Sequence, residues 1–402
     1  MRWRLRAHAE ARRDDNSTRM KAHPALTEEH EAFRDSMRRF VQREITPHAA
    51  AWDEAGAFPR ELYRKAAAAG LLGVGFPEEY GGTPADLLMH VVLSEEIALC
   101  GSGGVHASLF SHQIGSPPIA SAGSEELKRR VLPGILAGEK ISALAITEPS
   151  GGSDVANLKT TARREGADYV VNGEKTFITS GMRADYTTVA VRTGGPGAGG
   201  VSLLLIERER AGFTRAPLKK MGWWCSDTAS LHFDNVRVPA ANLIGEENAG
   251  FRIVMRNFNA ERLGMAAAAV GFAQACLEDA LAWAKERKTF GKRLVEHQVL
   301  RHKLVDMQMR IHAARAIVYD TAWKLTLAPR DPEAIAQLAM AKNFATRAMQ
   351  FCADEAVQIL GGAGFVRGTR AERVYREVKV MTIGGGAEEI MKELAAKQLG
   401  WL

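Results

Sequence analysis

The spacing of apolar residues changes twice along the chain and divides it into three regions of different predicted structure. Between residues 26 and 137 the apolar positions follow helical spacing of i, i+4, i+7 and i+8, as at Phe33, Met37, Phe40 and Val41. Shorter helices are predicted over residues 61–69, 85–99 and 124–136. The first region is therefore predicted to be a helical domain.

From residue 141 to about residue 238 the pattern becomes that of β-strands. Strands are predicted over residues 187–192, 201–206 and 231–238. Asn172-Gly173 separates two further strand-like runs, residues 169–171 and 174–179, and so predicts a two-residue hairpin. The middle of the chain is therefore predicted to be an all-β domain resembling a barrel or sandwich.

After Gly245 the helical period returns in long amphipathic runs, at about residues 249–286, 296–326, 332–360 and 388–398. Long helices with short connections predict an antiparallel four-helix bundle. The predicted fold is mostly α with a middle β domain. Its predicted domains are residues 23–138, 139–244 and 245–402, and residues 1–22 are predicted to be a basic, disordered extension or a misassigned start.

The composition limits the classes of protein to which the chain could belong. The 402 residues are 46% hydrophobic and 25% charged, and no apolar run is long enough to predict a membrane span. The four cysteines form no CxxC pair and no motif with metal-ligand spacing occurs, which predicts a reduced, cytoplasmic protein without a metal. The net charge of +6 suits a polyphosphate ligand without requiring nucleic acid.

Two glycine-rich segments are candidates for ligand binding. In residues 145–154 (AITEPSGGSD) a strand-like run breaks at Pro149, and Gly151 and Gly152 leave the backbone open beside two hydroxyl side chains. This segment alone fits either a ligand-binding loop or an exposed turn. Residues 195–200 (GPGAGG) match GxGxxG, but a strand follows them where a dinucleotide site needs a helix, so they are predicted to form a hairpin tip.

Six motifs in order resemble the acyl-CoA dehydrogenase family over about residues 26–402. They are AITEPSGGSD, KTFITSG (175–181), GWWCSDT (222–228), ERKTFGK (286–292), QILGGAGF (358–365) and IGGGAEEI (383–390). The resemblance implies the same three-domain fold, bound FAD, an acyl-CoA substrate, a homotetramer, and an electron-transfer flavoprotein as the electron acceptor. It also implies a role in fatty acid β-oxidation and lipid metabolism.

The resemblance assigns FAD-binding roles to residues of each motif. Those near the flavin ring and pyrophosphate are Leu144, Ile146, Thr147, Gly152, Ser153, Phe177, Ile178 and Thr179. Those that reach the FAD of a neighbouring subunit are Arg287, Thr289, Phe290 and Gln298. Those implied along the adenosine and near the C-terminal loop are Gln358, Ile359, Gly361, Gly362, Ala387 and Glu389.

The catalytic base departs from the commonest family pattern. Many members carry a catalytic Glu in a YEGT motif, but the matching position here is Gly385, which has no carboxylate. Long-chain and isovaleryl-type members carry the base on an earlier helix, directly before an Arg, and Glu261 in NFNAERLG (257–264) matches that position. Glu261 is therefore the expected base, and Glu388 is the alternative.

By resemblance, Glu261 removes the α-proton of the thioester while the β-hydride passes to flavin N5, giving a trans-2-enoyl-CoA. The residues implied to contact the substrate are Ser153, Asn259, Arg262, Gly385 and Gly386, with the Gly385 N–H binding the thioester oxygen. The run of glycines at 384–386 favours a long or branched acyl chain.

Two other functions remain open from the sequence. One is a different flavin chemistry on the same scaffold, such as an acyl-CoA oxidase, a nitroalkane oxidase or a monooxygenase. The other is a nucleic-acid-associated relative of the family, which would carry additional basic sequence after residue 402; outside residues 1–22 the chain has no comparable Lys/Arg cluster.

Overall fold

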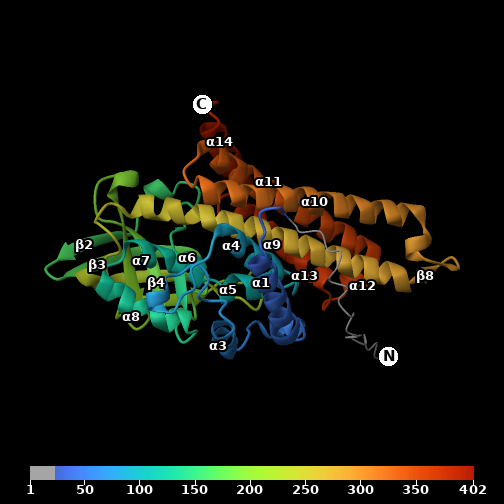
Figure 1. The fold of residues 1–402 in the computed structure, drawn as a ribbon. Coiled ribbons are helices and arrows are strands. Elements are labelled where there is room, and N and C mark those ends of the chain that lie inside the picture. Colours follow the sequence, from blue (N-terminus) through green and yellow to red (C-terminus); the bar gives the residue numbers. More distant parts are fainter. Residues whose placement is uncertain (1–22) are drawn as a thin grey trace.

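The computed structural model describes residues 23–402, so the extension expected over residues 1–22 lies outside the described residues. Figure 1 shows the strands of the middle domain gathered at one end of the molecule and the long C-terminal helices extending to the other end. The shorter N-terminal helices pack along one side of this assembly. The order helical, β, helical agrees with the predicted fold class.

The N-terminal part is helical throughout. Its elements are α1 (Glu28–Phe40), η1 (Val41–Ile45), α2 (Ala49–Ala55), α3 (Glu61–Ala68), η2 (Glu78–Tyr80), α4 (Leu87–Ala98), α5 (Gly103–Leu109), α6 (His112–Gly115), α7 (Pro117–Ala122) and α8 (Glu125–Leu136). Side-chain oxygens of Thr27, Asp86 and Ser124 accept hydrogen bonds from the first turns of α1, α4 and α8. These caps explain why the predicted helices begin where they do.

The middle part forms one seven-stranded sheet. Its strands are β1 (Ser142–Ala145), β2 (Thr161–Glu165), β3 (Asp168–Thr179), β4 (Tyr186–Arg192), β5 (Val201–Glu207), β6 (Phe213–Pro217) and β7 (Thr228–Pro239). The strand order is β1-β4-β2-β3-β7-β6, and β5 also pairs with β4. Residues 195–200 connect β4 to β5, as predicted for a hairpin tip. Short 3-10 turns η3 (Val155–Asn157), η4 (Ala198–Gly200) and η5 (Ala240–Asn242) complete this part.

The hairpin predicted at Asn172-Gly173 is wrong, because β3 runs through this dipeptide without turning. β3 pairs with β7 on both sides of it, from Asp168↔Pro239 to Thr179↔Thr228. The register shifts by one residue between Val171 and Gly173, which marks a β-bulge. The asparagine-glycine pair therefore serves a bulge inside a long strand.

The C-terminal part is a helix bundle. Its elements are α9 (Gly250–Glu286), β8 (Lys288–Thr289), β9 (Lys292–Arg293), η6 (Leu294–Glu296), α10 (Gln298–Leu327), α11 (Pro332–Leu360), α12 (Gly362–Phe365), α13 (Arg370–Ile383) and α14 (Glu388–Gln398). The predicted list lacked α13, which packs against α9 and α11, whereas α14 packs against α11. The many charged residues of α13 hid its helical period, and several of them are buried in ion pairs.

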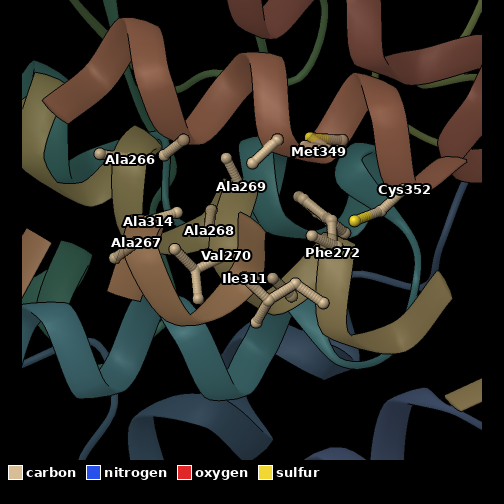
Figure 2. Packing of buried hydrophobic residues seen from close by; sticks show 14 of the residues in the cluster. Ala266, Ala267, Ala268, Ala269, Val270, Phe272, Ile311, Ala314, Met349 and Cys352 are labelled. Atoms are coloured by element: carbon tan, nitrogen blue, oxygen red, sulfur yellow. The ribbon is translucent and has the colours of Figure 1, made fainter. Parts of the chain in front are cut away.

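The long helix α9 lies in the middle of the bundle core. Figure 2 shows its run Ala266–Ala269 packed with Ile311 and Ala314 of α10 and with Met349 and Cys352 of α11. A Cβ on Gly271 would lie 2.2 Å from the Glu95 carbonyl oxygen, so α4 and α9 approach closely there. By length and composition α9 could cross a membrane, but 67% of the qualifying window is buried inside the protein.

Candidate active site

Glu261 lies where α9 passes from one hydrophobic core to another. One and two turns before it, Phe258 and Val254 pack with Ile119 and Leu203 in the core between the sheet and α7 and α8. From Leu263 onward the helix packs inside the C-terminal bundle. The carboxyl group is thus positioned by a rigid helix at the junction of the three parts of the fold.

The surroundings of Glu261 favour a proton acceptor. Its Oε2 is buried and has no hydrogen-bond partner in residues 23–402. Burial raises the pKa of Glu261 to about 7, against the opposing charges of Arg262 and Lys342. A carboxylate with this pKa can take up a proton near neutral pH.

Four of the five residues predicted to contact the substrate meet around Arg262, the residue after Glu261; they are Asn259, Arg262, Gly385 and Gly386. The fifth, Ser153, lies in the 147–153 loop of the middle domain. Arg262 is buried, and its Nε donates to the Gly385 carbonyl oxygen at 2.9 Å while its Nη1 donates to Asn259 Oδ1 at 3.3 Å. Within residues 23–402 the N–H of Gly385 has no acceptor. The loop at 384–386 therefore presents a free backbone donor next to the helix that carries Glu261. The side chain of Arg262 donates a hydrogen bond to this same loop.

Gly385 cannot carry a side chain without distortion. Its φ is 65°, and a Cβ there would lie 2.7 Å from Met265 Sδ. The position where the family pattern led us to look first for the base is thus a turn that glycine adopts readily, and the Met265 sulfur fills the space of a side chain.

We expect Gly385→Ala to lower the free energy of unfolding by about 1–2 kcal/mol, the cost of a side chain in this backbone conformation. It should also slow the dehydrogenation expected from the sequence, because it displaces the free N–H of residue 385. Urea unfolding and steady-state rates check this. Gly384→Ala is the control, because its nearest Cβ contact would be 3.3 Å and its φ is −64°. Equal effects of the two variants would contradict the prediction.

The alternative base, Glu388, is already engaged. Its carboxylate lies 2.8 Å from Lys392 Nζ and 2.7 Å from Arg347 Nη2. The hydrogen bond from Lys392, followed by that from Arg347, holds the pKa of Glu388 below its usual range. Ala387 is the N-cap of α14 and Glu389 is exposed on its first turn. Of the acidic residues near the loop within the described part of the chain, Glu261 alone combines a buried unpaired oxygen with a raised pKa.

The two segments of the middle domain that are predicted to bind the flavin are joined by a hydrogen bond. The Thr176 N–H donates to the Thr147 carbonyl oxygen at 2.9 Å, so the 147–153 loop lies beside the end of β3. There the register with β7 shifts by one residue between Lys175 and Ile178. Phe177 lies in this bulge with φ 59° and a 68% exposed side chain. An exposed aromatic ring on a strained backbone, next to the residue that hydrogen-bonds to Thr147, fits the edge of a flat cofactor.

Sequence reasoning missed the pair that supports this loop, Glu148 and Lys175. Lys175 is fully buried, and its Nζ donates to Glu148 Oε1 at 2.8 Å and to the Ile146 carbonyl at 3.0 Å. Glu148 also accepts from the N–H groups of Lys159 and Thr160, at 2.6 and 2.9 Å. Although burial opposes it, the charge of Lys175 helps lower the pKa of Glu148 to about 2. The sequence did hold one sign of this pair, because Lys175 is a charged residue inside a predicted strand.

The remaining predicted FAD contacts lie far from this loop. Thr289 is in the short β8–β9 hairpin, whose tip carries Phe290 with a 97% exposed side chain. Figure 1 places β8 at the end of the molecule opposite β2 and β3, and α12, which begins at Gly362, lies toward the β8 end. One chain therefore does not bring these residues together with Phe177. Also in the β8–β9 and α12 regions are Arg287, Gln298, Gln358, Ile359 and Gly361.

Three family models match most of the chain. They are the acyl-CoA dehydrogenase N-terminal domain over residues 27–139, the middle domain over 143–236 and the C-terminal domain over 248–400. The chain belongs to the acyl-CoA dehydrogenase family. It is accordingly an oxidoreductase of a family of flavoproteins.

Individual acyl-CoA dehydrogenases are similar to this chain over nearly its whole length. The mitochondrial long-chain specific acyl-CoA dehydrogenase of Sus scrofa is 39% identical, over 93% of this chain and 87% of that protein. An acyl-CoA dehydrogenase of Bacillus subtilis (strain 168) is 38% identical, over 93% and 98%. The structure of an acyl-CoA dehydrogenase from Geobacillus kaustophilus has a TM-score of 0.88 at 38% identity, covering 94% of this chain and 99% of that one.

Proposed function

We propose that this acyl-CoA dehydrogenase uses FAD and that Glu261 is its base, so that an acyl-CoA thioester becomes a trans-2-enoyl-CoA. The observation that carries the assignment is the buried, unpaired Oε2 of Glu261, next to the residue that contacts Gly385. A weakly acidic α-proton requires a base of raised pKa in a site with little water.

Two groups of the chain have distinct roles in the proposed reaction. Glu261 takes the α-proton of the thioester, and the N–H of Gly385 donates to the thioester oxygen. That hydrogen bond strengthens as negative charge develops on the oxygen, so it stabilises the transition state more than the substrate. Bound FAD would accept the β-hydride.

The residues of the chain fit FAD in two separate places. Thr147, Ser153 and the exposed ring of Phe177 would hold the flavin end. Arg287 and Phe290, at the other end of the molecule, are exposed where they can reach the FAD of a second copy. An arginine suits the pyrophosphate because its planar group donates two parallel hydrogen bonds. We therefore propose a homotetramer in which subunits share FAD sites.

The cellular setting follows from the same proposal. An electron-transfer flavoprotein would reoxidise the reduced enzyme, and fatty acid β-oxidation would supply its substrate. The four cysteines are buried and free, which supports a reduced, cytoplasmic location. The glycines at 384–386 suit a long or branched acyl chain, which a panel of acyl-CoAs of varied length and branching would identify.

Anaerobic titration with acyl-CoA tests the function. The purified protein should be yellow, with about one FAD per chain, and its flavin absorbance should bleach as enoyl-CoA appears. Fast reoxidation of the reduced protein by oxygen would favour an oxidase or a monooxygenase. A colourless protein that takes up no added FAD would contradict the proposal.

The dependence of the rate on pH should follow the ionisation of Glu261. Because the base must be ionised, kcat/KM should rise with pH through an apparent pKa of about 7. Rates measured between about pH 3.5 and 9 check this. A rise centred near the ordinary glutamate value of about 4.3 would show that the carboxyl group is not desolvated in the free enzyme.

A further inference from the structure

Lys342 of α11 is a buried cation beside the proposed site. Its side chain has 0% exposure, and its Nζ donates to the Gly386 carbonyl oxygen at 2.7 Å. It forms no ion pair within residues 23–402. Burying an ammonium with one hydrogen bond is costly, so a purely structural role would favour an apolar residue.

Two neighbouring contacts show what Lys342 helps to hold. Asn343, the next residue of α11, donates from Nδ2 to the Glu388 carbonyl oxygen at 2.9 Å. Arg262 of α9 donates to the Gly385 carbonyl oxygen at 2.9 Å. Donors from two bundle helices thus fix three carbonyls of the segment that contains the free Gly385 N–H.

We propose that Lys342 is a positioning residue for the dehydrogenation, because its ammonium holds the Gly386 carbonyl and favours the ionised form of Glu261. This deepens the proposed function and rests on Glu261 being the base. Fixing the Gly386 carbonyl restrains the Gly386–Ala387 peptide, and the contact of Arg262 with the Gly385 carbonyl restrains the Gly385–Gly386 peptide, so the backbone that follows the Gly385 N–H is held in place. The Gly385 N–H is then held ready for the thioester oxygen, with no reorganisation during the reaction.

The charges around the site support the electrostatic part. Glu261 faces two cations, Arg262 and Lys342, and both oppose the rise of its pKa that burial causes. Burial, together with Arg262, lowers the pKa of Lys342 to about 8, while Glu261 and Glu388 oppose this. At pH 7 the ammonium form therefore predominates.

A consequence is a bell-shaped pH profile. The acid limb follows ionisation of Glu261, and the alkaline limb follows deprotonation of Lys342, which releases the loop and disfavours the carboxylate. Because the two groups interact, the two apparent pKa values belong to the pair. Arginine does not titrate in this range, so Lys342→Arg should abolish the alkaline limb while retaining the charge.

The experiment compares Lys342→Met, Lys342→Arg and Lys324→Met in the FAD-loaded protein. Lys324 is the matched control, since its Nζ pairs with Asp320 and Gln337 on the bundle surface. Proton abstraction is measured as deuterium uptake at the α-carbon of 3,3-dimethylbutyryl-CoA, which has no β-hydrogen to transfer. The pH profile of flavin reduction, the FAD content and thermal unfolding are measured in parallel.

We expect Lys342→Met to reduce α-proton exchange by about tenfold and to move the acid limb upward by about half a pH unit. Lys342→Arg should keep the acid limb and lose the alkaline one, and Lys324→Met should resemble the parent. If Lys342→Met does not fold, the Lys342→Arg profile decides. Exchange and profile unchanged in Lys342→Met would overturn the positioning role, whereas exchange retained in Glu261→Gln would overturn the base itself.

Discussion

Glu261→Gln is expected to give a folded, FAD-containing protein whose flavin is reduced by acyl-CoA about 10²–10⁴-fold more slowly, the usual contribution of a positioned base. Glutamine has nearly the same shape but accepts no proton at neutral pH. Because the Oε2 of Glu261 has no hydrogen-bond partner among the described residues, the amide breaks no ion pair there. It also removes a carboxyl group whose desolvation costs stability, so the variant should unfold at the same urea concentration as the parent or a higher one.

Glu388→Gln is the control for this variant. Glu388 is ion-paired with Arg347 and Lys392, so its amide should affect stability slightly and leave the rate within a few-fold of the parent. Stopped-flow reduction under anaerobic conditions measures both variants. The assignment fails if Glu261→Gln retains near-normal reduction, and the reverse ranking of the two variants would make Glu388 the base.

The sequence could indicate Glu261 because local motifs carried the information. An empty family position at 385 and a glutamate before an arginine at 261 suggested a relocated base. The contact of Arg262 with the Gly385 carbonyl explains why relocation is feasible, since the two segments adjoin in space. A base moved from one segment to the other can act from the same region of the site.

Other parts of the site depended on tertiary contacts that no local pattern reveals. Lys342 lies amid the apolar core positions of α11, and nothing in its neighbours predicts that it reaches Gly386, 44 residues away. Glu148 pairs with Lys175 across 27 residues for the same reason. Arg262, which stays a predicted substrate contact, also donates to Gly385, 123 residues away, and no local pattern predicts that contact.

The elements of the fold also divide into those that the sequence predicted and those that it did not. Strong helical periods predicted α9, α10 and α11 within a few residues, because each has an apolar side that the bundle buries. The prediction failed at α13, whose buried charges are neutralised by partners elsewhere in the chain, such as Asp53. It also failed at Asn172-Gly173, where pairing with β7 overrides the local preference for a turn.

Lys175→Met is expected to destabilise the protein by about 3–5 kcal/mol and to weaken FAD binding at least about tenfold. Methionine fills a similar volume but leaves the Glu148 carboxylate, which is buried, without its counter-ion. It also removes the donor to the Ile146 carbonyl, so both ends of the Thr147 region lose support. Urea unfolding gives the first effect, and FAD titration of the stripped protein gives the second.

Lys392→Met provides the comparison, because its partner is also a glutamate but its side chain is 65% exposed, so the loss should be at most about 1 kcal/mol. The double variant Glu148→Gln/Lys175→Met should be more stable than Lys175→Met alone, since it no longer buries an unpaired charge. It should still bind FAD weakly if the ion pair shapes the loop. Recovery of both stability and FAD affinity in the double variant would show instead that the unpaired charge alone caused the loss, and that the 147–153 loop keeps its form without the pair.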